Sequence, residues 1–327
     1  MFTIKFLVYQ LLFINNQDNM IKKKKIIFEN ILGYSDFFHK IIRGIILKIL
    51  HYKKLRHLKK YPLLVTFAFD EISNIINLDG LYEKRELETF FSWIKSKKIS
   101  FKKGFAIDVG SNIGNHTLYF SRFFKTVFGF EANKDIFQVL SLNARLKRNV
   151  RVYNYAISDQ NKKGFLDVDI SNISASKLSN SIINSKQNTK CKKLDSLFKN
   201  KKNIQLIKID VEGKELQVLL GAKNILLSNR PIILFEHHLQ NYDEKGNSKC
   251  ISFLSTMGYK TYATIGHIPS VSTKNSFIIK LFKNLISFFV YRMKMVVRIE
   301  TDISPNFYPF IVAIPDWLEK KLKNSRY

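Results

Sequence analysis

Cysteine is nearly absent from this sequence of 327 residues. The two that occur, Cys191 and Cys250, lie far apart and do not form the paired spacing of a metal-binding motif. A disulfide framework and a cysteine-based zinc site are therefore not expected. So little cysteine favours a reducing compartment, and we predict that the protein resides in the cytoplasm.

Long uncharged apolar runs are also missing. Residues 1–15 are apolar, but they lack a basic start and a small-residue cleavage site. They also fall short of the roughly 20 residues that a transmembrane helix needs. No membrane span or signal peptide is therefore expected, and a translation start at Met20 would remove this stretch altogether.

Acidic residues are scarce beside basic ones. The chain has 26 aspartates and glutamates against 54 lysines and arginines, which gives a net charge of +28. Such a charge suggests contact with an acidic partner, which could be nucleic acid, an anionic membrane face or a sugar phosphate. The sequence is also crowded with lysine, asparagine and isoleucine, so a nucleotide bias in the source genome is the competing explanation.

A basic amphipathic pattern occupies residues 36–60. Its apolar and basic side chains fall on opposite helical faces, with Phe38, Ile42, Ile45 and Ile49 on one and Lys40, Arg43, His51 and Lys54 on the other. Such a helix either packs on its own domain or lies peripherally on an anionic membrane, here the inner membrane surface. We divide the chain into a basic extension at 1–61 and one main domain at 62–327, with a basic insertion at 267–305.

The main domain is predicted to begin with a short strand and turn at 62–80 and a helix at 82–97. From residue 104, near-continuous apolar runs alternate with helical spacing. The expected strands are 104–110, 126–132, 150–157, 204–211, 231–238, 258–264 and 308–315, and the expected helices are 113–124, 134–146, 214–227 and 248–257. Residues 169–190 are polar and predict a loop. This alternation predicts an α/β fold with a parallel sheet covered on both faces.

A glycine-containing turn, Gly110-Ser-Asn-Ile-Gly114, follows the first of these strands. It lacks both the middle and the final glycine of the G-x-G-x-x-G dinucleotide motif, and it lacks the Gly-Lys-Ser/Thr of a P-loop, so a pyrophosphate or a triphosphate is a poor fit. Asp108, at the end of the strand, brings a negative charge that would repel phosphate and suit a cation. In folds of this kind the ligand lies beyond the carboxyl ends of the strands.

The second and third strands supply further ligand contacts. Glu131 ends the second strand, where it could accept hydrogen bonds from both hydroxyls of a ribose. After the third strand, Ala156 to Asp159 could contact an adenine edge. An adenosine with a positively charged tail that contains no phosphate is S-adenosylmethionine. We therefore predict S-adenosyl-L-methionine as the cofactor.

Five blocks of sequence, in this order and spacing, resemble the FkbM family of S-adenosylmethionine-dependent methyltransferases: IDVGSNIGNHTLYFS, FGFEANKDIFQVLSLNA, NYAISD, LIKIDVEGKELQVLLGA and IILFEHH. The resemblance implies a Rossmann-like class I methyltransferase fold with a seven-stranded, mostly parallel sheet. Residues 308–315 suit its one antiparallel strand. It also implies a cofactor site lined by Asp108, Gly110, Asn112, Gly114 and Glu131, with Ala156 and Ser158 near the adenine.

The acceptor side of the site should lie at the ends of the fourth and fifth strands. Methyl transfer to an alcohol requires alignment of donor and acceptor and removal of the hydroxyl proton by a base or through a metal. The candidates are Asp210, Glu236, His116 and His237, with Asp210 and Glu236 holding either an imidazolium or a divalent cation. His237 and His238 cannot both point into one pocket while the strand continues, because side chains alternate.

The resemblance implies O-methylation, often of secondary metabolites and bacterial surface glycans. A sugar or nucleotide-sugar hydroxyl in capsule or lipopolysaccharide biosynthesis is the preferred acceptor, and residues 79–83 resemble the lead-in of glycan-associated members, which brings Tyr82 and Glu83 toward the site. A ribose hydroxyl in RNA is the alternative. Base methylation is disfavoured because Asp210 is not followed by Pro-Pro-aromatic or Pro-Cys. A scaffold protein without turnover is disfavoured by the intact Asp108, Glu131 and Asp210.

Overall fold

The computed structural model describes residues 35–68, 70–167, 177–179, 186–237, 242–243, 246–267 and 295–324. The chain forms two compact units, residues 1–52 and residues 53–327, and the sheet and the site belong to the second. The apolar stretch at 1–15, Met20 and most of the predicted insertion lie outside the described residues. No helix within the described ranges is long and apolar enough to cross a membrane.

The predicted amphipathic helix is confirmed as α2, Ser35–His57. Its apolar residues keep the expected helical spacing, and the side chains of Ile42, Ile45 and Ile49 are exposed. The apolar face of helix α2 is therefore exposed.

The strand predicted within 62–80 is wrong, because helix α3 occupies Glu71–Asp79. The side chain of Asp70 caps this helix by accepting a hydrogen bond of 2.8 Å from the Ser73 N–H. Gly80 ends it in the left-handed conformation, with its N–H bonded to the Ile76 carbonyl at 2.7 Å. The apolar run before Asp70 suggested a strand, whereas these two caps define a helix. Helix α4, Lys84–Ser96, follows as predicted.

Within the residues that the structure describes, the main sheet has eight strands in the order β11-β10-β12-β9-β8-β1-β2-β3. They are β1 (Phe105–Val109), β2 (Thr126–Phe130), β3 (Val150–Tyr153), β8 (Ile204–Ile209), β9 (Ile232–His237), β10 (Thr261–His267), β11 (Met295–Glu300) and β12 (Tyr308–Ile314). Strands β3, β2, β1, β8 and β9 run parallel, and β12 inserts antiparallel between β9 and β10. The predicted class of fold and the antiparallel strand at 308–315 are therefore confirmed.

The eighth strand corrects the expected count of seven. Strand β11 lies inside the predicted insertion and pairs antiparallel with β10, so this part of the insertion extends the sheet. The pairing covers an edge of β10 whose backbone N–H and C=O groups would otherwise lack strand partners.

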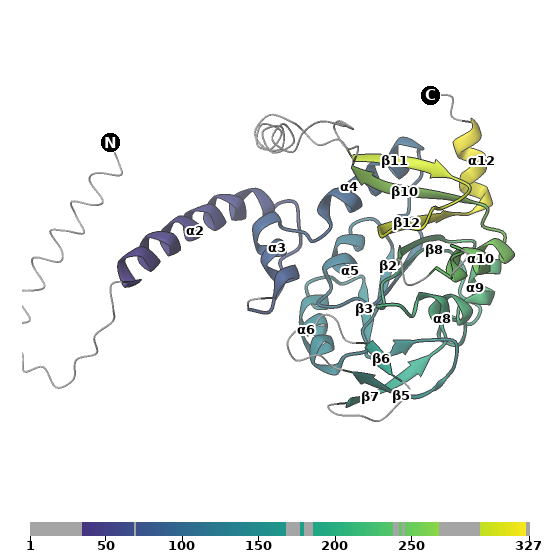
Figure 1. Ribbon diagram of the computed structural model, residues 1–327, viewed down its shortest axis with the longest axis horizontal. Helices are drawn as coiled ribbons and strands as arrows, with labels where there is room; N and C mark the ends of the chain where they lie inside the picture. The colour runs from purple at the N-terminus through teal and green to yellow at the C-terminus, as the bar shows by residue number, and fades with distance from the viewer. Residues whose placement is uncertain are drawn as a thin grey trace, which may run out of the picture. The chain divides into compact units, whose positions relative to one another are not determined.

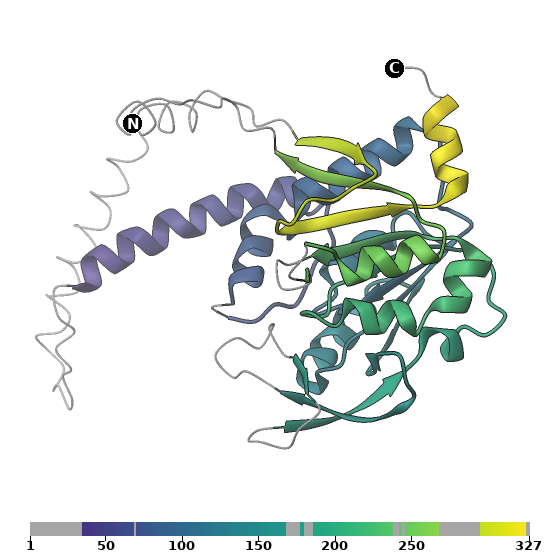
Figure 2. The ribbon, with the colours of Figure 1, turned by 45° about the vertical axis from the view of Figure 1, so that its right-hand side comes forward.

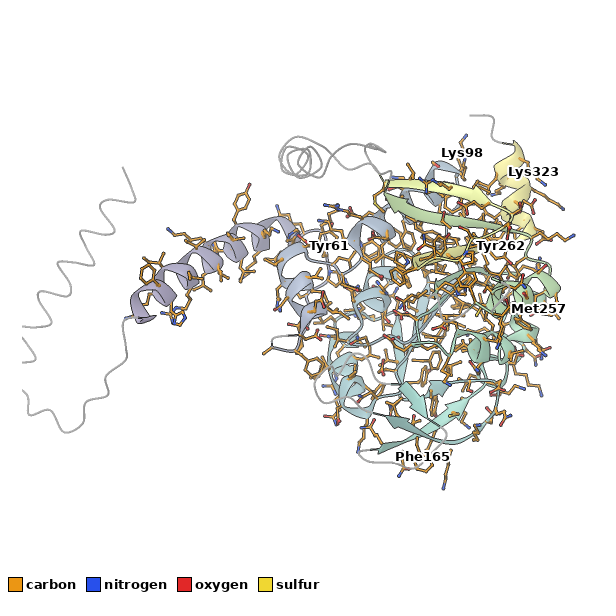
Figure 3. The ribbon with its side chains drawn as sticks, viewed as in Figure 1. Tyr61, Lys98, Phe165, Met257, Tyr262 and Lys323 are labelled. Carbon is orange, nitrogen blue, oxygen red and sulfur yellow. The ribbon has the colours of Figure 1, made fainter. Side chains whose placement is uncertain are left out.

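Helices cover both faces of the sheet, as Figures 1 and 2 show. They are α5 (Asn115–Phe120), α6 (Lys134–Ala144), α7 (Leu194–Leu197), α8 (Glu215–Leu220), α9 (Lys223–Asn229), α10 (Lys249–Thr256) and α12 (Asp316–Asn324). Alternate strand residues enter different cores: Ile107 packs with α7 to α10, and its neighbour Ala106 packs with α4 and α5. Side chains fill both layers between sheet and helices (Figure 3).

A second, four-stranded sheet in the order β4-β7-β5-β6 was not predicted. Its strands are β4 (Ala156–Ile157), β5 (Lys162–Asp167), β6 (Lys177–Ser179) and β7 (Lys186–Lys192). The single strand expected at 150–157 is therefore divided between β3 and β4. The prediction of a loop at 169–190 is wrong at β6 and β7. Strand β5 pairs with both of them, so their backbone hydrogen-bond partners lie outside this polar segment.

Candidate active site

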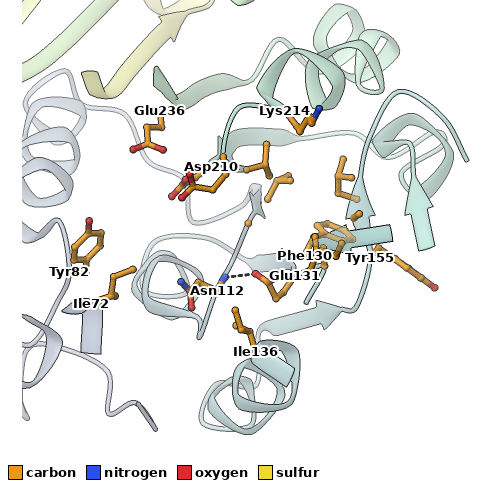
Figure 4. Close-up of a pocket in the computed structure, with 18 of the residues that line it drawn as sticks. Ile72, Tyr82, Asn112, Phe130, Glu131, Ile136, Tyr155, Asp210, Lys214 and Glu236 are labelled. Atoms are coloured by element: carbon orange, nitrogen blue, oxygen red, sulfur yellow. Dashed lines mark hydrogen bonds between the residues drawn. The ribbon is translucent and has the colours of Figure 1, made fainter. Parts of the chain in front are cut away.

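A pocket opens at the carboxyl ends of the central parallel strands. The residues that end β1, β2, β8 and β9 form its floor, and segments beside α3, α4 and β4 form its walls. It is lined by Ile72, Tyr82, Glu83, Val109, Gly110, Asn112, Phe130, Glu131, Ala132, Ile136, Tyr155, Ala156, Ile157, Leu166, Asp210, Val211, Glu212, Lys214 and Glu236. Figure 4 shows Tyr82, Asp210 and Glu236 toward one end and Glu131, Phe130 and Tyr155 toward the other. This is the place where parallel α/β sheets bind ligands.

The glycine turn forms the middle of the pocket floor. The N–H groups of Gly110 and Ser111 both donate to the Phe130 carbonyl, at 3.0 and 2.9 Å, which ties the turn to β2. Gly110 has φ +78°, and a Cβ at this position would lie 1.7 Å from the Asp210 carbonyl oxygen. Only glycine allows the turn after β1 to pass this close to β8.

Glu131 and Asn112 join the turn to the end of β2. The Asn112 N–H donates to Glu131 Oε2 at 2.9 Å (Figure 4). The Asn133 N–H donates to Oε1 at 2.8 Å. Burial raises the pKa of Glu131 to about 7, against the effect of these hydrogen bonds. Each carboxylate oxygen retains a further lone pair, so Glu131 can also accept hydrogen bonds from a ribose.

A buried ion network lies beneath the acceptor end. Asp108 is fully buried, and its Oδ2 accepts a hydrogen bond of 2.5 Å from Thr117 Oγ1. Lys208 Nζ lies 3.9 Å from Asp108 Oδ1 and 2.8 Å from Asp210 Oδ2. Burial alone would lower the pKa of Lys208, but the two aspartates raise it. The structure thus places Asp108 behind the turn, with a protein cation beside its carboxylate, and not among the lining residues.

Asp210 and Glu236 form a hydrogen-bonded pair of carboxyl groups at the acceptor end. Burial would raise the pKa of Asp210, but the Lys208 ammonium outweighs burial and lowers it. Burial and the charge of Asp210 raise the pKa of Glu236 to about 9. Near neutral pH the pair therefore holds one proton, with Asp210 ionised and Glu236 neutral.

His116 is brought to the edge of this end but does not line the pocket. Its side chain is buried on α5, and Nε2 lies 3.1 Å from Oε2 of Glu83, which does line the pocket. Tyr82 lines it as well, and burial followed by the charge of Glu83 raises the pKa of Tyr82 to about 12. Tyr82 and Glu83, which the sequence predicted to approach the site, therefore form part of the pocket wall.

Besides Asp108 and His116, three further residues predicted for the site lie outside the lining. His237 is fully buried, and its ring packs against Phe235 and Tyr242 with centroids 5.7 and 4.7 Å apart. Because strand side chains alternate, it points away from the face that Glu236 uses. Ser158 is buried beside the pocket, with Oγ 3.0 Å from Asp159 Oδ1. Gly114 is the N-cap residue of α5 and has left-handed backbone. The other predicted cofactor residues, Gly110, Asn112, Glu131 and Ala156, do line the pocket.

Lys208 was missed by the sequence reasoning, although it carries a signal. It is the one charged residue in the strand IQLIKI, and a lysine in a strand buried on both faces needs a buried counter-charge. Glu212, Lys214 and Tyr155 also line the pocket and were not proposed as site residues. They occupy loops or short elements whose positions depend on tertiary contacts.

The residues proposed as metal ligands do not suit a divalent cation. One oxygen of Asp210 already pairs with an ammonium, and Glu236 retains its proton near neutral pH. Within the described parts of the chain, no three histidine, cysteine, aspartate or glutamate side chains gather where they could hold a metal ion.

Comparisons with known proteins agree with the sequence resemblance. Residues 108–261 match the family model of the methyltransferase FkbM domain, which confirms the family resemblance in this segment. The hexuronic acid methyltransferase AglP of Haloferax volcanii is 33% identical over 150 residues, which is 44% of this chain and 60% of that protein. The chain thus spans somewhat less than two thirds of this curated relative.

Solved structures show partial similarity. A methyltransferase FkbM from Methylobacillus flagellatus KT is 16% identical with a TM-score of 0.33, over 50% of this chain and 42% of that one. An rRNA methylase from Streptococcus thermophilus is 12% identical with a TM-score of 0.36, over 71% and 96% of the two chains. The fold assignment rests on the strand order and not on these scores.

Proposed function

We propose, from the FkbM methyltransferase domain in residues 108–261, that the protein is an S-adenosylmethionine-dependent O-methyltransferase that acts on a sugar hydroxyl. The observation that carries this proposal is the division of one pocket into two chemically different ends. A glycine turn and Glu131 lie at one end, and a carboxyl pair with Tyr82 and Glu83 lies at the other.

The residues at the first end fit the cofactor. Glu131 would accept hydrogen bonds from the ribose hydroxyls, and Tyr155 and Ala156 would flank the adenine. Gly110 lets the turn pack directly against the Asp210 carbonyl, and the amino-acid tail would lie along the surface of this turn. When bound, S-adenosylmethionine supplies a methyl group on a positively charged sulfur. The protein's task is to align the acceptor with that group and to remove the acceptor's proton.

The residues at the second end fit a polyhydroxylated acceptor. Asp210 and Glu83 offer carboxylate oxygens that accept hydrogen bonds from hydroxyls, and neutral Glu236 retains a proton to donate. The relative from Haloferax volcanii is named for a hexuronic acid, which supports a sugar acceptor and makes a uronic acid the first to test. A nucleotide sugar or a surface glycan would present the same chemistry, whereas RNA ribose and a secondary metabolite are alternatives.

The test is methyl transfer from radiolabelled S-adenosylmethionine to separate acceptor classes. Purified protein is incubated with hexuronic acid oligosaccharides, nucleotide sugars, bacterial polysaccharide and RNA. We expect label in a sugar fraction, in a linkage that is stable to alkali as an ether is. Label confined to RNA would replace the sugar assignment, and absence of transfer to every class would overturn the proposed activity.

We also propose that α2 contacts an anionic membrane surface peripherally. Its exposed apolar stripe includes Ile45 and Ile49, and basic residues such as Arg43 lie on the opposite face. In liposome co-sedimentation, the full chain with both isoleucines changed to glutamate should lose binding to anionic vesicles. Leu47→Glu is the matched control, because Leu47 is also exposed but lies on the basic face. If the double isoleucine variant and Leu47→Glu bind anionic vesicles equally, nucleotide bias in the genome would remain the explanation of the high net positive charge.

A further inference from the structure

Seven of the described non-glycine residues have left-handed backbone, and three of them line the pocket. These three are Glu83 with φ 52°, Asn112 with φ 48° and Glu212 with φ 52°. Asparagine tolerates this conformation, but glutamate adopts it only where the surrounding structure enforces it. Such strain at a site-lining carboxylate points to a functional constraint on where that carboxylate lies.

The side chain of Glu83 lies beside His116 and does not cap the helix that it precedes. Glu83 is the N-cap residue of α4, but it makes no side-chain capping bond. Its Oε2 atom lies 3.1 Å from His116 Nε2, and these two buried atoms form an ion-pair contact without hydrogen-bond geometry. Glu83 also lines the pocket, so its left-handed backbone places the carboxylate between His116 and the acceptor end.

The first turn of α5 holds the Glu83 segment through consecutive residues. Asn115 Oδ1 accepts from the Tyr82 N–H at 3.1 Å, and Asn115 Nδ2 donates to the Tyr82 carbonyl at 3.2 Å. His116 then contacts Glu83, and Thr117 donates to Asp108. The sequence after the glycine turn thus positions the acceptor wall of the pocket.

The neighbouring ionisable groups at this end are poorly suited to accept a proton. Asp210 is paired with Lys208 and with the Glu236 carboxyl, and Glu236 is already protonated near neutral pH. Tyr82 is neutral, with its pKa raised to about 12. Glu83 faces these groups, His116 and the Lys208 ammonium, which it affects electrostatically. Glu212, the other strained glutamate, is the one rival in the lining at this end.

We propose that Glu83 takes the proton from the acceptor hydroxyl and that His116 is a positioning residue that fixes the Glu83 carboxylate. The assignment rests on the proposed function. The hydroxyl proton passes to a Glu83 carboxylate oxygen, and the hydroxyl oxygen gains the methyl group. The bond between that methyl carbon and sulfur breaks, with its electron pair remaining on sulfur. The proton leaves Glu83 for solvent after the product departs.

Glu83→Gln tests this role while preserving shape. The variant should lose about 10²- to 10⁴-fold in kcat with the sugar class that the wild type methylates. Its affinity for S-adenosylhomocysteine, measured by calorimetry, should stay within about twofold of wild type, because Glu83 lies at the acceptor end. Glu88→Gln is the control on the same helix, since Glu88 pairs with Lys60 and Tyr61 and does not line the pocket.

A double-mutant cycle tests the positioning role of His116. His116→Phe should lower kcat in the wild-type background and have no further effect on kcat in Glu83→Gln. Wild-type rates in Glu83→Gln, or a larger loss in Glu212→Gln, would overturn this assignment and leave the methyltransferase proposal standing. If the wild type methylates no sugar, the proposed function and this assignment both fall.

Discussion

Replacing Lys208 with methionine should destabilise the fold far more than removal of an ordinary ion pair. The Lys208 side chain is 3% exposed and lies 3.9 Å from Asp108, which is fully buried, and 2.8 Å from Asp210, which is 33% exposed, so the buried charge left without its cation is that of Asp108. Methionine fills a similar volume but leaves two carboxylates near each other without their cation. Removing one partner of a buried pair costs about 3–5 kcal/mol, because the remaining charge is uncompensated.

The assay is urea unfolding followed by circular dichroism, with Lys53→Met as the matched control. Lys53 pairs with Asp79 at 3.0 Å, a similar distance, but the two side chains are 35% and 53% exposed. Such a surface pair contributes about 0–1 kcal/mol. We therefore expect a difference of several kcal/mol between the two variants, or a fall in Tm of roughly 6–20 °C for Lys208→Met.

Two further outcomes decide whether the charge argument is right. Adding Asp210→Asn to Lys208→Met should recover part of the lost stability, because one of the two uncompensated carboxylates is then neutral. A loss below about 1 kcal/mol for Lys208→Met, equal to that of Lys53→Met, would refute the argument that the ammonium balances these aspartates. It would then indicate that water or a changed protonation state replaces Lys208.

Three further predictions concern the pocket. Gly110→Ala should abolish S-adenosylhomocysteine binding in calorimetry, because a Cβ would lie 1.7 Å from the Asp210 carbonyl oxygen; binding within tenfold of wild type would contradict the turn geometry. Glu131→Ala should weaken the same binding by about 30-fold, or roughly 2 kcal/mol, if Glu131 accepts the ribose hydroxyls; unchanged affinity would reassign the ribose site. Glu236 has a folded-state pKa raised to about 9, so its contribution to stability is fully present below its unfolded pKa of about 4.3 and is lost as pH rises through about 9. Urea unfolding between pH 5 and 9 should therefore show a smaller fall in stability for Glu236→Gln than for wild type, and identical pH profiles would contradict the shared-proton pair.

The order of the parallel elements could be predicted from sequence because it depends on local patterns. The runs that became β1, β2, β8 and β9 are almost continuously apolar, as strands buried on both faces must be, and helical spacing separates them. Gly110 and Glu131 could be assigned to the ligand side for a related reason. Strands that run parallel bring their carboxyl ends to one edge, so residues just after them converge whatever the side-chain details.

Other features depended on contacts that the pattern of apolar residues does not show. Part of the strand and turn predicted at 62–80 is helix α3, Glu71–Asp79, which the caps at Asp70 and Gly80 define. Strand β7 is polar and forms only because β5 and β4 pair with it, and β11 forms against β10. Backbone pairing of this kind leaves little trace in the paired sequences, since every residue except proline carries the required N–H and C=O groups.

The roles of the charged residues were decided by tertiary structure alone. The sequence placed Asp108, Asp210, Glu236, His116 and His237 near one edge of the sheet, but it could not show which face each side chain uses. The alternation of β9 directs Glu236 into the pocket and His237 into the core. Protonation followed from distances, because Lys208 lies close enough to Asp210 to hold it ionised, and burial beside Asp210 keeps the proton on Glu236. Charge interactions fall with distance and grow with burial, and both quantities exist only once the chain has folded.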